Sequence, residues 1–277
     1  MDEYIDWPQE VSLETYAKCN AACTFCPYTT LDRIGERMSD AMIDSVIDQL
    51  RAHPRAFFFS PFKVNEPFLD KRLMAICRKV NATLPKAFIR LFTNGSALTA
   101  KHVAEVAALD RVAHLWCSLN EVDSGEYKAL MGLDFERTAA NLDHLHNEVL
   151  AGRFTHPVDL SRVSSLDGSR NDEFRTYCFA RWPLFNVHVL KRDGWLGAID
   201  PSNPAVPDRP CPRWWELSIM ANGKAALCCM DGAGEYVIGD LTKQTLYDIY
   251  NSEAWRANRV KLWSRRNVSP CSRCTYG

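Results

Sequence analysis

The feature that most constrains the fold is an alternation of strand-like and helix-like segments over about the first 200 of 277 residues. Such alternation predicts a parallel sheet with right-handed helical crossovers. Six such strands predict an α/β fold, a partial (β/α)6 barrel related to the closed eight-stranded barrel. We expect strands at 11–16, 56–62, 87–93, 112–120, 158–164 and 185–190, and helices at 39–51, 68–83, 99–109, 134–150 and 169–181.

The sequence changes character after residue 190, where glycines and prolines recur between 194 and 210 and indicate a linker. Two strand-like runs, 214–220 and 224–229, flank Asn222-Gly223, and this arrangement predicts a β-hairpin. A helix at about 241–255 and a cysteine-bearing tail follow. We therefore divide the chain into a barrel at residues 1–195 and a linker with a small cap, a hairpin plus a helix, at 196–277.

Cysteine is the unusual component, with 11 residues in a chain that carries 33 basic and 34 acidic residues. The chain begins without a secretory signal, and no apolar run reaches the roughly 18 residues that span a bilayer. We therefore expect a cytoplasmic protein, in which metal ligation explains many cysteines better than disulfides do. The near-zero net charge argues against nucleic acid or a membrane as a partner.

Three cysteines directly follow the first expected strand, where barrel enzymes build their sites. Cys19, Cys23 and Cys26 are separated by three and then two residues. Three thiolates can bind three irons of a 4Fe–4S cluster, which proteins usually hold with four cysteines. The missing fourth cysteine would leave one iron open to an outside ligand, whereas a structural zinc site needs four closed ligands.

This spacing, with the aromatic Phe25 before the last cysteine, resembles the motif of the radical S-adenosylmethionine (SAM) superfamily. The resemblance implies a 4Fe–4S cluster at Cys19, Cys23 and Cys26, with SAM bound to its open iron and Phe25 beside the cofactor. It further implies that SAM is cleaved to a 5′-deoxyadenosyl radical, which removes a hydrogen atom from the substrate. An electron donor such as flavodoxin or ferredoxin is implied as a partner.

Segments after the next two strands resemble other elements of that superfamily. Asn65-Glu66-Pro67 is similar to its Gly-Gly-Glu-Pro element, although Val64 and Asn65 stand in place of the glycines. The resemblance implies that Glu66 binds the amino group of SAM. Asn94, within a Thr-Asn-Gly turn, is implied as a further cofactor contact.

Strand parity separates the side chains of segment 112–120 into two faces. The apolar set, which includes Cys117, should meet the helices, and the polar set should face the barrel interior. Ser118 and Asn120 then lie at the mouth, and the resemblance implies that they contact the SAM ribose. Cys77 lies on an apolar helical stripe, so we interpret it and Cys117 as core residues.

A second cysteine group comprises Cys211, Cys228, Cys229, Cys271 and Cys274. The close pair Cys271 and Cys274 can bind one metal centre, and strand neighbours point to opposite faces, so only one of Cys228 and Cys229 should be a ligand. The pattern resembles the shortened SPASM domain called twitch. It implies one auxiliary 4Fe–4S cluster at Cys211, Cys228 or Cys229, Cys271 and Cys274, with Cys228 favoured. A zinc ribbon is the alternative.

Together these patterns predict an enzyme that oxidises a small sugar- or cyclitol-like molecule, and the cysteine layout is similar to that of a short cyclitol dehydrogenase of the superfamily. One alternative is a redox-neutral epimerase, in which Cys178 or the non-ligand member of Cys228 and Cys229 would return the hydrogen atom. A peptide-modifying enzyme is another. The non-enzyme alternative is a zinc-binding adaptor, which would give a colourless preparation.

Overall fold

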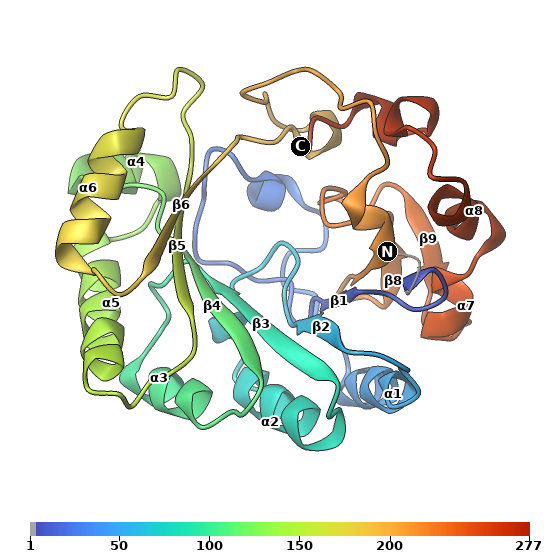
Figure 1. The fold of residues 1–277 in the computed structure, drawn as a ribbon, viewed down its shortest axis with the longest axis horizontal. Coiled ribbons are helices and arrows are strands. Elements are labelled where there is room, and N and C mark those ends of the chain that lie inside the picture. The colour runs from blue at the N-terminus through green and yellow to red at the C-terminus, as the bar shows by residue number, and fades with distance from the viewer. Residues whose placement is uncertain (1–3) are drawn as a thin grey trace.

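This computed structural model describes residues 4–277. They contain one sheet of nine strands (Figure 1). The strand order is β6-β5-β4-β3-β2-β1-β7-β8-β9, and the sheet does not close on itself. The first six strands are parallel and confirm the predicted partial barrel. They are β1 (Glu10–Leu13), β2 (Phe57–Ser60), β3 (Ala87–Thr93), β4 (Val112–Ser118), β5 (Val158–Val163) and β6 (Asn186–Leu190).

Helices cover the outer face of this curved sheet (Figure 1). Five match expected segments, and Ser39 caps the first of them by accepting a hydrogen bond from the Met42 amide. The sixth, α4, was not expected, because its eight residues show little helical periodicity in sequence. The helices are α1 (Asp40–Leu50), α2 (Leu73–Thr83), α3 (Ala100–Ala107), α4 (Ser124–Met131), α5 (Phe135–Leu150) and α6 (Asn171–Arg181).

The main hydrophobic core lies between the sheet and these helices. On β4, Leu115 and Cys117 are fully buried in this core, whereas Trp116 and Ser118 are only half-buried. The alternation confirms the predicted parity of the strand. Cys77 on α2 is also a core residue, as its helical stripe indicated. The polar side chains of β4 therefore belong to the interior face of the barrel.

The C-terminal hairpin extends the barrel sheet. Its first strand, β7 (Glu216–Ile219), pairs in parallel with β1, and β8 (Lys224–Ala226) and β9 (Val237–Asp240) follow antiparallel. Gly223 turns the hairpin with a φ of +81°, and a Cβ there would lie 2.8 Å from the sulfur of Met42. The predicted cap is thus joined to the barrel through backbone hydrogen bonds.

Two helices replace the single one that we expected near the end of the chain. These are α7 (Leu246–Tyr250) and α8 (Glu253–Lys261), and the turn at Asn251-Ser252 separates them. Thr245 caps α7 through a capping box with Asp248. Within residues 4–277, none of the helices has the length and apolar character that a bilayer span requires.

Candidate functional site

Three free cysteines lie together on the loop that follows β1. Cys19, Cys23 and Cys26 are half-buried. Burial raises the pKa of Cys19 to about 12 and raises the pKa of Cys23 further, and repulsion between the neighbouring thiolates adds to both shifts. Thiolates without a bound cation are therefore disfavoured in this loop. A bound cation would have to offset the cost of burying their negative charge.

The unexpected helix α4 helps to fix this loop. The amide of Ala22 donates to the carbonyl of Met131 (2.8 Å), and the amide of Thr24 donates to the carbonyl of Leu130 (3.0 Å). Both carbonyls belong to the last turn of α4, where such groups have no partner within the helix. The helix end therefore holds the backbone between Cys19 and Cys26.

Glu66 occupies a buried position in the loop that follows β2. Its carboxylate accepts hydrogen bonds from the Asn94 amide (2.6 Å), the Thr93 hydroxyl (2.8 Å) and the Phe68 amide (3.2 Å). These bonds favour the charged form, but burial has the larger effect and raises the pKa of Glu66 to about 7. The site therefore contains a carboxyl group that can change its charge near neutral pH.

The loops after β1, β2 and β3 meet around Cys19. The amide of Glu66 donates to the carbonyl of Lys18 (2.8 Å). Asn94 donates from Nδ2 to Asn20 Oδ1 (2.9 Å), and the same nitrogen lies 4.0 Å from Cys19 Sγ. The structure thus places the predicted cofactor contacts Glu66 and Asn94 beside the first cysteine.

Ser118 and Asn120 lie at the carboxyl end of β4, as predicted. Ser118 is half-buried and pairs in register with Ser161 of β5. Asn120 is fully buried with a φ of +64°, and its amide accepts from the Val163 amide (2.9 Å) and donates to the Ser118 carbonyl (3.1 Å). Asn120 therefore ties β4 to β5, and its contact with a ribose stays a prediction.

A cavity at the same end of the barrel connects the cysteine loop to the loop after β5. Phe25 and Leu130 line it on one side, and residues 162–167 and Arg192 line it on the other. Phe25 thus borders an open cavity, and its contact with a cofactor stays a prediction. Sequence analysis did not single out the residues of the β5 loop, because they carry no recognisable motif. Their position after a parallel strand was the only signal that could have found them.

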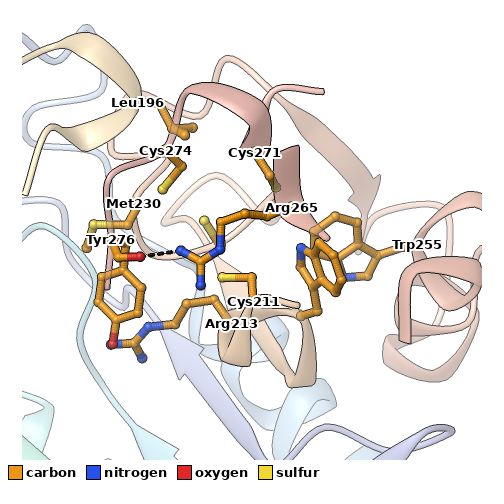
Figure 2. Close-up of a pocket in the computed structure, with 11 residues that line it drawn as sticks. Leu196, Cys211, Arg213, Met230, Trp255, Arg265, Cys271, Cys274 and Tyr276 are labelled. Carbon is orange, nitrogen blue, oxygen red and sulfur yellow. Dashed lines mark hydrogen bonds between the residues drawn. The ribbon is translucent and has the colours of Figure 1, made fainter. Parts of the chain in front are cut away.

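Four of the five cysteines of the second group line one cavity in the C-terminal part (Figure 2). Cys229 is not part of its lining and instead lies within electrostatic reach of Arg213, Glu216 and Lys63. Because β8 ends at Ala226, Cys228 and Cys229 lie in the turn after it and not in the strand that we expected at 224–229, yet they still face different surroundings. The four lining cysteines are Cys211, Cys228, Cys271 and Cys274.

The charges around this cavity suit an anionic occupant. No acidic side chain is among the eleven described residues that line it, whereas Arg213 and Arg265 are. Several buried donors of the lining have no hydrogen-bond partner within residues 4–277, among them Arg265 Nη2, Arg213 Nε and Trp255 Nε1. An iron–sulfur cluster held by four thiolates would supply both negative charge and sulfur acceptors, so the donor set fits this group.

Among residues 4–277, no three His, Cys, Asp or Glu side chains converge on a position that suits a single metal ion. A 4Fe–4S cluster does not need such convergence, because each cysteine binds a different iron atom. The cysteine loop after β1 fits the same group through its three thiols.

Cys178 lies apart from both cysteine groups. It is on α6 and is fully buried in the main hydrophobic core, where burial raises the pKa of its thiol to about 12. The structure therefore does not bring Cys178 to the interior face of the barrel, where a hydrogen donor to a substrate would have to lie.

Two family profiles match the chain. The one described as "Radical SAM superfamily" covers residues 13–155, and the SPASM profile, described as "Iron-sulfur cluster-binding domain", covers residues 211–275. A curated relative is the S-adenosyl-L-methionine-dependent 2-deoxy-scyllo-inosamine dehydrogenase of Niallia circulans. It is 22% identical over 271 residues, which cover 95% of this chain and 91% of that protein.

Solved structures of three proteins share the fold. The complex of BtrN with AdoMet and 2-DOIA superimposes with a TM-score of 0.67 at 17% identity, over 96% of this chain and 92% of BtrN. Streptococcus suis SuiB, bound to the precursor peptide SuiA, gives 0.71 at 13% identity, over 97% and 70% of the two chains. Native anSMEcpe with bound AdoMet gives 0.69 at 13% identity, over 96% and 86%.

Proposed function

Because the chain belongs to the radical SAM superfamily, whose profile matches just over half of it, we propose that it dehydrogenates a small sugar- or cyclitol-like molecule. The observation that carries this proposal is the four-cysteine cavity, since a two-electron oxidation needs an acceptor for its second electron. The similarity to a cyclitol dehydrogenase over 95% of the chain supports the choice of substrate class.

We assign the radical site to the loop after β1, with a 4Fe–4S cluster bound by Cys19, Cys23 and Cys26. When bound there, the cluster and SAM supply a 5′-deoxyadenosyl radical that can remove a hydrogen atom from the substrate. Glu66 would accept a hydrogen bond from the SAM amino group, and Phe25 would border the cofactor. A flavodoxin or ferredoxin remains the proposed electron donor.

Three more polar side chains complete the proposed cofactor site. Asn94 lies between Glu66 and Cys19, so it can orient groups bound to either of them. Ser118 and Asn120 are proposed to border the ribose from β4. The cavity lined by Phe25 and residues 162–167 is the place where the remainder of the cofactor fits, because it opens beside the cysteine loop.

The proposed auxiliary site holds one 4Fe–4S cluster at Cys211, Cys228, Cys271 and Cys274. The orientation of Cys228 into the cavity favours it over Cys229 as the ligand. All four of these cysteines are buried. We keep the division into a barrel at residues 1–195 and an auxiliary part at 196–277 as a proposal.

SAM should bind more tightly as the pH rises through neutrality. Burial raises the pKa of Glu66 to about 7, so its carboxylate is ionised above that pH and attracts the positively charged cofactor. We expect a roughly tenfold gain in affinity between about pH 6 and about pH 8, measured by equilibrium dialysis of the reconstituted protein. Glu66→Gln should weaken binding and remove this dependence; an unchanged pH profile in the variant would contradict the assignment.

The experiment that tests the function is incubation of the anaerobically reconstituted protein with reductant, SAM and deuterated aminocyclitols, sugars or peptides. We expect deuterium in 5′-deoxyadenosine, together with one oxidised product for each SAM consumed. Deuterium transfer from peptides alone would reject the small-molecule class. A colourless, zinc-containing preparation would reject radical chemistry altogether.

The redox-neutral alternative has one observation in its favour. Cys229 lies outside the four-cysteine cavity, among the charged residues Arg213, Glu216 and Lys63. It is thus a better-placed hydrogen donor than the core residue Cys178. Turnover without an oxidised product, lost in Cys229→Ala while deuterium transfer persists, would establish this alternative.

A further inference from the structure

We propose that Arg265 is a positioning residue of the auxiliary site, whose buried guanidinium compensates the negative charge of the cluster and raises its reduction potential. This inference rests on the proposed cluster at Cys211, Cys228, Cys271 and Cys274. Beyond that proposal, it identifies Arg265 as the side chain that controls how readily the auxiliary cluster accepts an electron.

Arg265 is buried without a carboxylate to pair with. It is 0% exposed, Nη1 donates to the carbonyl of Tyr276, and Nε lies 3.4 Å from the carbonyl of Arg209. Nη2 has no partner, and no ion pair of Arg265 occurs within residues 4–277. An isolated buried charge is costly, so the missing counter-charge should come from an occupant of the cavity.

Arg265 points into that cavity beside the cysteines (Figure 2). Cys211, Cys271 and Cys274 line the same cavity, so the guanidinium lies beside three of the four proposed ligands. Its free Nη2 is also available to a sulfur of the bound cluster.

The neighbouring charged residues do not replace this role. Arg213 lines the same cavity, but it pairs with Glu216 (2.6 Å) and donates to the Tyr276 hydroxyl (2.8 Å). Asp193 lies within electrostatic reach of Arg265, yet no ion pair joins them in the described part of the chain. Arg265 therefore has the less compensated charge of the two arginines.

A second buried cation approaches the site at Cys228. Lys63 is fully buried, and its Nζ donates to the carbonyls of Asp231 (2.7 Å) and Cys228 (3.2 Å). Lys63 and Arg265 thus place positive charge near different ligands of the same site. This charge distribution is the one that a group with net negative charge requires.

The effect on electron transfer follows from charge. Reduction makes a cluster more negative, so a buried positive charge stabilises the reduced form more than the oxidised form. Net charge and hydrogen bonds to sulfur are two of the features that set the potential of such centres. Arg265 supplies both, and its removal should make the auxiliary cluster a poorer electron acceptor.

The test compares wild type with Arg265→Gln, Arg265→Met and Arg265→Lys. Iron and sulfide content are measured first, followed by a redox titration monitored by electron paramagnetic resonance. The glutamine retains an N–H donor for the Tyr276 carbonyl and the lysine retains the charge. Arg266→Met is the matched control, because Arg266 is the exposed sequence neighbour that pairs with Asp208 (3.5 Å).

We expect Arg266→Met and Arg265→Lys to keep about eight irons and a potential close to that of wild type. Arg265→Gln should keep its fold and shift the auxiliary potential to a more negative value, and Arg265→Met should shift it likewise or lose the auxiliary irons. A wild-type potential in Arg265→Gln, or equal shifts in Arg265→Lys and Arg265→Gln, would overturn this inference alone. Wild-type protein with only about four irons would overturn the auxiliary cluster itself and this inference with it.

Discussion

Replacing Cys23 with serine should lower the iron content from about eight to about four per chain and abolish the reductive cleavage of SAM. The loop after β1 contributes Cys19, Cys23 and Cys26 and no further cysteine, so the loss of one leaves two thiols for a cluster that usually has four. A serine hydroxyl is a poor substitute for a thiolate at iron. Iron and sulfide analysis and chromatography of 5′-deoxyadenosine measure both effects.

Other cysteines provide controls for this experiment. Cys77→Ala changes a core residue of α2 and should keep about eight irons and full SAM cleavage. Cys228→Ala should lose about four irons while SAM cleavage continues, whereas Cys229→Ala should keep them. Full iron loading in Cys23→Ser would refute the radical site, and equal iron loss in the Cys228 and Cys229 variants would refute the choice between them.

Replacing Glu14 with glutamine should lower the free energy of unfolding by about 3–5 kcal/mol. Glu14 is 0% exposed and binds Arg33 through two hydrogen bonds, from Nε (2.8 Å) and Nη2 (3.1 Å). It also accepts from the amides of Val64 and Ala221, both at 3.3 Å. Without its charge, Arg33 and the neighbouring Lys63 would remain buried as uncompensated cations.

Denaturant unfolding of the apo protein measures this change, with Glu105→Gln as the matched control. Glu105 pairs with Arg78 (3.0 Å) on the surface, where the side chain of Arg78 is 55% exposed. Such pairs contribute about 0–1 kcal/mol, so the control should unfold almost as wild type does. Equal losses for the two variants would mean that the buried Glu14–Arg33 pair does not stabilise the fold.

Local sequence predicted the six strands of the barrel and all of its helices except α4, and it singled out residues that lie together around the first cysteine group. Periodicity identified the six parallel strands, and parity placed Cys117 in the core. The cysteine spacing and the family motifs identified residues that the fold brings together at Cys19, Glu66 and Asn94. These signals succeed because each depends on a short stretch of chain that follows one strand.

The parts that sequence did not predict depend on contacts between distant segments. The sequence near residue 216 does not indicate that β7 pairs with β1, because the residues of a strand do not specify which other strand it pairs with. Arg33 and Lys63 have the polar character of ordinary surface loops, yet both are buried by segments about 200 and 165 residues away. Their burial depends on tertiary contacts with residues 228–232, which sequence alone does not reveal.

The pairing of β1 with β7 fixes how far apart the two cysteine sites lie. β1 leads directly to the loop of Cys19, and β7 and its hairpin lead to Cys228, while Leu13 stands opposite Ile219. A register shift of two residues between β1 and β7 would keep each side chain on the same face of the sheet. It would move one cysteine site by about 7 Å relative to the other. Electron tunnelling falls steeply with distance, so under the proposed function this register would set how fast an electron reaches the auxiliary site.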